Sequence, residues 1–410
     1  MPKNRDQLFK NFTFLSAINL INVITPLAII PWLIHNLGIS TYGTIAFHQY
    51  FGQFVLMLVD FGFPMYAVNE VANRRNSKED LGRFLYSSYF IKLVLALIAM
   101  SSATSIIISG QASSALGISS VLLVGFVANA ILTSFYPSWF FQGIEKIQKV
   151  ILPTFLSRLL SLIIIVTFVR TPKDVWIVPI AYCLGSTVLL LTAYVPIQRR
   201  IGHTSKPSRT EIWNIAREAL QVFWSRLIVM GYVASSPALV RVAGGDAGVA
   251  IYSLCEKAVA LGRMPFDMFA NAAYPRLAQG YDKSFAQRLI KKQVVVATAA
   301  LLTALTAAWA LRHHIDTQWA ASLTYLSVYL VALIPIAMHS FIGTCVLLVN
   351  RQRMVLSTSI IFGLFAYLVT YVVGGWLFED QILRVITSMV MVEFGILFIR
   401  HIISRRLKLI

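Results

Sequence analysis

Residues 74–109 read RRNSKEDLGRFLYSSYFIKLVLALIAMSSATSIIIS, a basic and polar stretch followed by a long apolar run. The apolar part is long enough to cross about 30 Å of hydrocarbon as a helix, and only helices and closed barrels satisfy their backbone polar groups there. The same alternation continues along the whole chain. It predicts twelve membrane-spanning helices, at residues 12–34, 44–68, 85–109, 117–140, 151–169, 175–197, 212–238, 248–273, 294–311, 320–348, 355–377 and 382–403.

The composition excludes an ordinary soluble domain. Apolar residues make up 57% of the 410 residues, charged residues make up 13%, and the mean hydropathy is +0.71, whereas about 25% of a soluble domain is charged. The net charge of +18 does not indicate nucleic-acid binding, because the cations lie in the connections between apolar runs and not in one soluble patch. We therefore expect a protein that works inside or across a membrane.

The distribution of Lys and Arg predicts the orientation. Of the 35 basic residues, 24 lie at the termini and in alternate connections, with Arg400 at the end of the last span counted at the C-terminus. Four lie in the other connections and seven lie deeper inside spans. Cytoplasmic connections are enriched in Lys and Arg, so we expect both termini to be cytoplasmic and the number of spans to be even. Cys183, Cys255 and Cys345 all lie in spans without metal-ligand spacing, and we expect neither a disulfide nor a metal.

A polar and basic connection at residues 199–211 follows the sixth span and divides the spans six and six. Halves with an even number of spans run parallel to one another. We therefore expect an all-α integral membrane protein whose halves, residues 1–205 and 206–410, are two parallel six-helix bundles around a central cavity. A protein of this architecture without a soluble domain resembles a secondary transporter, whose site lies between the halves near the midplane.

Ionisable residues inside the spans are the functional candidates, since a charge at the bilayer centre costs about 2.5–3.5 kcal/mol on insertion scales. Two deep arginines in the fifth and seventh spans have no acidic residue one helical turn away, which favours an anionic substrate. We predict a cationic substrate-binding cavity that contains Arg158, Arg226, Arg263, Lys257 and Lys92. We predict roles in coupling or gating for Asp267, Glu256, Asp60, Glu393 and His339. The alternative for each is a structural role, as a salt bridge, an interhelical cap or an ordinary hydrogen bond.

The eighth span carries the densest charge. Glu256, Arg263 and Asp267 fall on one face, within about 40° of each other at 100° per residue. Pro265 lies between the last two and is expected to kink the helix, and broken helices are common at transporter sites. The alternative is that Arg263 and Asp267 form an intrahelical pair that only neutralises itself.

The sequence contains no motif of covalent catalysis. It has no Gly-x-Ser-x-Gly, no His-Glu-x-x-His and no Walker loop. We therefore expect neither an enzyme nor a cofactor, and no hydrolysis of ATP by this chain.

Trp139–Lys146 reads WFFQGIEK, which resembles the Phe-Gln-Gly-x-Glu-Lys signature of Wzx-type polysaccharide flippases, a branch of the multidrug/oligosaccharidyl-lipid/polysaccharide exporter superfamily. The stretches LGISTYG at residues 37–43 and VDFG at residues 59–62 are similar to the family's turn between the first two spans and to its second-span end. This resemblance implies a flippase that moves undecaprenyl-pyrophosphate-linked oligosaccharide, such as an O-antigen repeat unit, from the cytoplasmic to the periplasmic leaflet. It implies a bacterial inner-membrane protein that works by alternating access and ion antiport.

The same resemblance implies its partners. These are the lipid-linked oligosaccharide, membrane lipids, and the glycan polymerase and chain-length regulator of the same system, with no nucleic acid. Two other functions are alternatives. A drug/cation antiporter of the same superfamily would need an acidic site, whereas more of the ionisable residues deep in these spans are basic than acidic. A membrane-embedded glycan polymerase would be expected to carry a large periplasmic loop, and the expected connections are short.

Overall fold

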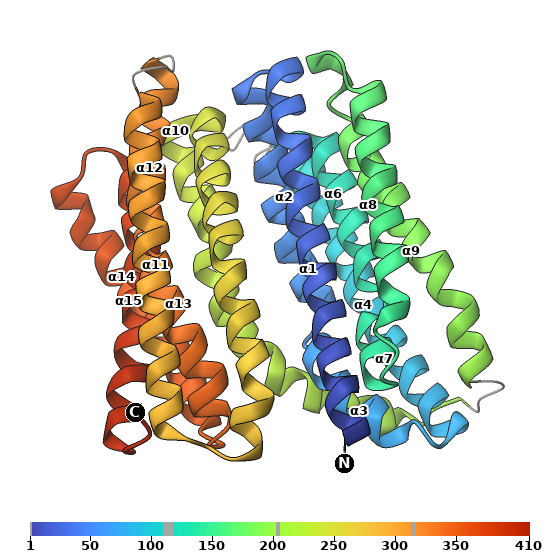
Figure 1. Ribbon diagram of the computed structural model, residues 1–410. Coiled ribbons are helices and arrows are strands. Elements are labelled where there is room, and N and C mark those ends of the chain that lie inside the picture. Colours follow the sequence, from blue (N-terminus) through green and yellow to red (C-terminus); the bar gives the residue numbers. More distant parts are fainter. Residues whose placement is uncertain (1, 110–117, 202–205, 313–316) are drawn as a thin grey trace. The chain divides into compact units, whose positions relative to one another are not determined.

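The computed structural model describes residues 2–109, 118–201, 206–312 and 317–410, and every regular element in these ranges is a helix (Figure 1). The chain forms two compact units. One comprises Thr13–Met230, and the other comprises Gly231–Ile410 with the N-terminal residues up to Phe12. These helices confirm the all-α class, and their length and apolar composition are those of membrane spans.

The boundary predicted at residues 205 and 206 lies beside residues 202–205, which are outside the described ranges. The first unit continues past this point to Met230. The boundary between the halves therefore stays a prediction, as does the first residue of the span expected at 117–140, because residue 117 is also outside these ranges.

The first unit is built from the helices between Thr13 and Met230, and the beginning of the first helix, up to Phe12, belongs to the other unit. In chain order they are α1 (Pro2–Leu37), α2 (Ile39–Asp60), α3 (Phe63–Arg74), α4 (Lys78–Ser109), α6 (Ser120–Ser134), α7 (Ser138–Gly143), α8 (Gln148–Phe168), the short 3₁₀ helix η1 (Pro172–Asp174), α9 (Ile177–Ile201) and the beginning of α10 (Arg209–Gln279).

A break at residues 61 and 62 ends α2 and begins α3. Phe61 and Gly62 both have positive φ, 45° and 78°, a conformation that costs glycine little and other residues more. A Cβ atom on Gly62 would also lie 2.6 Å from the carbonyl oxygen of Ala219. Only glycine therefore fits the turn and allows α10 to approach it, which explains the glycine of the VDFG stretch.

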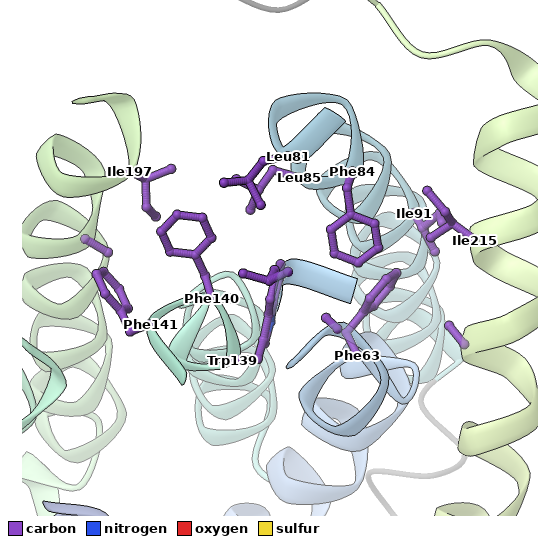
Figure 2. Packing of buried hydrophobic residues seen from close by; sticks show 14 of the residues in the cluster. Phe63, Leu81, Phe84, Leu85, Ile91, Trp139, Phe140, Phe141, Ile197 and Ile215 are labelled. Atoms are coloured by element: carbon purple, nitrogen blue, oxygen red, sulfur yellow. The ribbon is translucent and has the colours of Figure 1, made fainter. Parts of the chain in front are cut away.

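The WFFQG stretch forms α7 and lies in the main apolar core of this unit. Trp139, Phe140 and Phe141 are each at most 2% exposed, and Figure 2 shows them among side chains of α3, α4, α9 and α10. The Trp139 ring packs against Phe63 and Phe84 at centroid distances of 6.5 and 6.0 Å. The stretch that carries the family resemblance is therefore a packing element of this unit.

The second unit contains the rest of α10 and the helices after it. These are α11 (Lys283–Arg312), α12 (Thr317–Leu330), α13 (Leu333–Phe341), the π-helix η2 (Ile342–Leu348), α14 (Arg353–Leu377) and α15 (Gln381–Arg406). Asp380 caps α15, because its carboxylate accepts hydrogen bonds from the backbone N–H groups of Ile382 and Leu383.

The 71 residues of α10 would extend about 100 Å as one straight helix, far more than a membrane spans. Gly245 breaks it, with φ 59° and ψ −162°. The chain folds back at Gly245 (Figure 1), because the residues on its two sides come close together: a Cβ atom on Gly248 would lie 3.3 Å from Val240 Cγ1. Eleven apolar stretches of membrane length lie in the described residues. The one at Arg226–Gln279 includes the break at Gly245, and it covers the predicted eighth span and the second half of the predicted seventh span. The helix break lies at Gly245, and the backbone remains helical through Pro265.

We predict that Gly143→Ala destabilises the protein by about 1–3 kcal/mol through overpacking. The new methyl group would lie 2.6 Å from Val71 Cβ and 2.8 Å from the Val68 carbonyl oxygen. Thermal unfolding of the purified protein in detergent measures the effect. Gly280→Ala is the matched control, because a Cβ atom there meets nothing within 4 Å. Equal unfolding temperatures for the two variants would contradict the packing role of α7.

Candidate functional site

The charged residues singled out in the sequence are divided between the two units. The first unit holds Asp60, Lys92, Arg158 and Arg226, and the second unit holds the remaining candidates. Because all of them belong to apolar helices, each charge needs a partner inside the protein or in a ligand.

Lys92 of α4 is bound tightly by its neighbours. Its Nζ donates to Asp60 Oδ1 at 2.8 Å and to the Ser134 carbonyl oxygen at 2.5 Å, and its side chain is 1% exposed. The ammonium group also lies 5.8 Å from the centroid of the Phe63 ring. Lys92 therefore ties α2, α4 and α6 together in this structure, and substrate binding by Lys92 stays a prediction.

Arg226 of α10 presents an unsatisfied donor. Its Nη1 atom is buried and has no hydrogen-bond partner among the described residues. It lies close enough to Lys92 for the two positive charges to interact. A buried guanidinium nitrogen without an acceptor is costly, and the cost is removed by an anion that supplies oxygen atoms.

Arg158 of α8 is held by neutral groups. Its Nε donates to Asn22 Oδ1 of α1 at 3.0 Å, and the Tyr182 ring lies close to it. An amide oxygen satisfies one donor but does not neutralise the charge. Asn22 is thus a positioning partner for Arg158, a pairing that sequence spacing could not reveal because 136 residues separate them.

In the second unit, a histidine and a glutamate are paired beside an arginine. The distance from His339 Nε2 of α13 to Glu393 Oε2 of α15 is 2.6 Å. Arg400, two turns further along α15, donates through Nη1 to the His339 carbonyl oxygen at 2.9 Å and through Nε to Ser359 Oγ at 3.0 Å. The sequence predicted His339 and Glu393 separately, whereas Arg400 was counted among the cations of the connections.

The local backbone makes room for Arg400. The π-helix η2 begins directly after α13, and π-helical turns occur frequently at functional sites. A Cβ atom on Gly343 would lie 2.5 Å from Arg400 Nη1. Glycine at this position therefore lets the guanidinium group lie against the turn that follows His339.

Arg263 and Asp267 form the intrahelical pair that the sequence left as an alternative. Arg263 Nε donates to Asp267 Oδ2 at 3.1 Å, and Ser340 Oγ donates to Asp267 Oδ1 at 2.6 Å. The side chains are 44% and 34% exposed. Arg263 also lies within the electrostatic range of Glu393. The pair therefore connects α10 to the histidine–glutamate cluster and does not stand by itself.

Lys257 and Glu256 lie further along α10. Lys257 Nζ donates to Ser253 Oγ at 2.5 Å and lies within the electrostatic range of Glu256. The Glu256 carboxylate also lies within electrostatic range of Tyr252 and Tyr329. The rings of these two tyrosines stack with their centroids 6.3 Å apart. The roles predicted for Lys257 and Glu256 remain predictions.

Known proteins similar to this chain are membrane transporters. The model of the family described as "Polysaccharide biosynthesis protein" matches residues 8–281, more than half of the chain. A protein of Escherichia coli (strain K12) named "Putative O-antigen transporter" is 29% identical over 175 residues, which cover 43% of this chain and 41% of that protein. A Shigella dysenteriae protein of the same name is 20% identical over 380 residues, or 90% of this chain and 94% of its own length.

The fold is also found in solved structures. An inward-facing multidrug resistance MATE family transporter of the MOP superfamily is 18% identical, with a TM-score of 0.67 and coverage of 97% of this chain and 95% of that one. The apolar helices therefore define a multi-pass membrane protein, and its named relatives are transporters. The chain belongs to the polysaccharide biosynthesis protein family, which confirms the resemblance that the WFFQGIEK stretch indicated.

We predict that Asp60→Asn lowers the free energy of unfolding by about 3–5 kcal/mol, because Lys92 loses its counter-charge while buried. The double variant Asp60→Asn/Lys92→Met should recover most of this loss. Chemical or thermal unfolding in detergent measures both, with the exposed connection variant Lys173→Ala as the control. If Asp60→Asn unfolds like the unmodified protein, the pair does not anchor the helices.

Proposed function

We propose that this chain is a flippase of the bacterial inner membrane for an undecaprenyl-pyrophosphate-linked oligosaccharide, with both termini cytoplasmic. It moves the substrate from the cytoplasmic to the periplasmic leaflet by alternating access. The observation that carries this proposal is the buried Arg226 Nη1, which lacks a hydrogen-bond partner among the described residues. A pyrophosphate supplies both the negative charge and the acceptor oxygens that this group requires.

The charge balance of the first unit supports an anionic substrate. Of the deep charges predicted from its sequence, Asp60 is the one carboxylate, and Lys92 already neutralises it. Arg226 and Arg158 then remain as two cations whose polar contacts are neutral or lacking among the described residues. Two uncompensated guanidinium groups are expensive inside a membrane, and an anionic headgroup bound in this unit would offset that cost.

The second unit is suited to ion coupling. Its acids are already paired, Glu393 with His339 and Asp267 with Arg263, so little net positive charge is left for substrate. The imidazole nitrogen and the carboxylate of the His339–Glu393 pair are both groups that can bind a proton. The groups that face the pair are Arg400 of α15, Tyr329 of α12, and Arg263, Asp267 and Tyr232 of α10. We propose that a proton binds here as the substrate leaves.

A drug/cation antiporter is the less favoured function. It would bind a cationic substrate through a carboxylate, whereas Asp60, Asp267 and Glu393 each have a cation or an imidazole within 3.1 Å. A glycan polymerase is disfavoured because the named relatives are transporters. The polymerase and the chain-length regulator are proposed only as partners that receive the flipped product.

Deletion of the gene tests the proposal. Lipid-linked oligosaccharide should then accumulate, remaining on the cytoplasmic leaflet and inaccessible to a periplasmic glycosidase. A plasmid-borne copy should restore surface glycan. If the deletion strain displays normal glycan and accumulates no intermediate, the chain does not transport this lipid.

We predict that Arg226→Ala and Arg158→Ala each lower transport by about 100-fold, the effect of losing a charged hydrogen bond worth roughly 3 kcal/mol. Arg→Lys should retain part of the activity, because the charge remains although the planar group is lost. Surface glycan in the deletion strain reports transport, and immunoblots report membrane levels. Arg170→Ala, in the exposed connection before η1, is the control. Full complementation by both alanine variants would exclude a cationic substrate site.

We predict that Glu393→Gln removes the dependence of transport on a pH gradient, because the amide cannot share a proton with His339. Exchange between leaflets without a gradient should continue. Flipping of a fluorescent substrate lipid in proteoliposomes measures both. Glu379→Gln, at an exposed position before α15, should behave like the unmodified protein. An unchanged gradient dependence in Glu393→Gln would locate the coupling group elsewhere.

A further inference from the structure

An apolar groove of about 660 Å³ runs between α13, α14 and α15 of the second unit. Among the thirteen residues that line it are four phenylalanines and two methionines, which are Phe362, Phe365, Phe394, Phe398, Met338 and Met391. Phe365 and Phe398 are 60% and 57% exposed, so their rings form open walls of the groove and not part of a closed core.

Two glycines create the groove by bringing α14 and α15 close together. A Cβ atom on Gly363 would lie 3.0 Å from Ile396 Cγ1, and one on Gly395 would lie 3.1 Å from Ala366 Cβ. The helices therefore pack closely at these glycines, and the larger phenyl rings project beside the contact. Phe362 packs with Phe365 and Phe398 at centroid distances of 6.2 and 6.3 Å.

This groove differs from an ordinary lipid-facing surface. The exposed side chains of α4 are mostly aliphatic, namely Leu93, Val94, Leu97, Ile98 and Ile108, with two aromatic residues, Tyr86 and Phe90, in its first half. Such a surface is sufficient to contact disordered acyl chains. Aromatic residues gather at membrane interfaces mainly as Trp and Tyr, whereas this set is Phe and lies along the middle of α14 and the second half of α15. Methionine adds a side chain that adapts to an irregular ligand.

One end of the groove is basic. His401 lines that end, and Arg405, one turn further along α15, lies within electrostatic range of it. Arg405 and Arg406 occupy the last turn of the helix. An apolar channel that ends at cations is complementary to an amphiphile with an apolar chain and an anionic head.

We propose that this groove binds the isoprenoid chain of the lipid-linked substrate, with its phosphate end toward Arg405. The identity of the lipid rests on the proposed function. Repeated methyl branches and double bonds present flat, polarisable faces that fit between phenyl rings, whereas a saturated acyl chain gains little from them. The groove thus selects the carrier lipid by its tail, separately from the recognition of its headgroup.

The groove adjoins the proposed coupling pair through both of the helices that carry it. Met338 lines the groove and precedes His339, and Phe394 lines the groove and follows Glu393. A chain bound in the groove therefore contacts α13 and α15 beside the two residues whose side chains meet inside the unit.

Photolabelling tests the proposal. The purified protein in nanodiscs of phosphatidylethanolamine and phosphatidylglycerol would be labelled with a polyprenyl phosphate that carries a diazirine in its chain, and the labelled peptides identified by mass spectrometry. Labels are expected on α14 and α15 around Phe365 and Phe398, and unlabelled polyprenyl phosphate should displace them while excess phosphatidylglycerol should not.

Matched variants separate the groove from the general apolar surface. The triple variant Phe365→Leu/Phe394→Leu/Phe398→Leu should reduce labelling about tenfold, because three aromatic contacts are lost while apolarity is kept. Val369→Trp, which fills the groove, should reduce it as well. The controls are Phe90→Leu/Phe155→Leu/Phe168→Leu, which changes three exposed rings of the first unit, and Leu368→Trp, which adds a ring to α14 outside the groove.

Three results would overturn the proposal. They are labelling displaced equally by phosphatidylglycerol, labelling confined to other helices, and cross-links in the groove that join two copies of this chain. The assay does not depend on transport. If the groove is labelled as expected but the deletion strain displays normal glycan, only the proposed function is overturned. If the groove is not labelled but the deletion strain accumulates the intermediate, only the proposed lipid-binding role of the groove is overturned.

Discussion

Hydrocarbon provides neither hydrogen bonds nor counter-ions, and the structure depends on how the chain meets this constraint. The backbone meets it by forming helices along nearly every described segment. The side chains meet it by pairing across helices. Lys92 joins α4 to α2 and α6, and Glu393 joins α15 to α13. A few such pairs have a large effect on stability, because leaving one charge unpaired inside the membrane costs more free energy than most single apolar contacts contribute.

The two units meet the constraint to different extents. In the second unit, acids and bases are matched, and an imidazole sits at the centre of the cluster. In the first unit, Arg226 has a buried nitrogen without a hydrogen-bond partner among the described residues, and Arg158 is held by an amide. A cluster of deep charges with excess positive charge is suited to hold an anion, and a cluster in which acids and bases are matched is suited to respond to a proton. We infer that binding and coupling are separated along the chain.

Much of the fold could be predicted from the sequence. Apolar runs of membrane length predicted where helices lie in the described residues, whereas the break at Gly62, inside the span expected at 44–68, was not predicted. The family resemblance of WFFQGIEK was also visible, although the sequence could not show that Trp139 and Gly143 serve in packing. Pro265 shows the opposite case, because a strong local signal for a break lies within continuous helix.

The sequence by itself determined which segments enter the membrane and which charges must enter with them, because both follow from local hydropathy and helix length. Only the tertiary structure decided the partners of those charges. His339 and Glu393 are 54 residues apart, Lys92 and Asp60 are 32 apart, and Arg158 and Asn22 are 136 apart. Helical periodicity relates residues within a turn or two, whereas these pairs depend on which helices pack together, and that is set by the summed fit of many side chains.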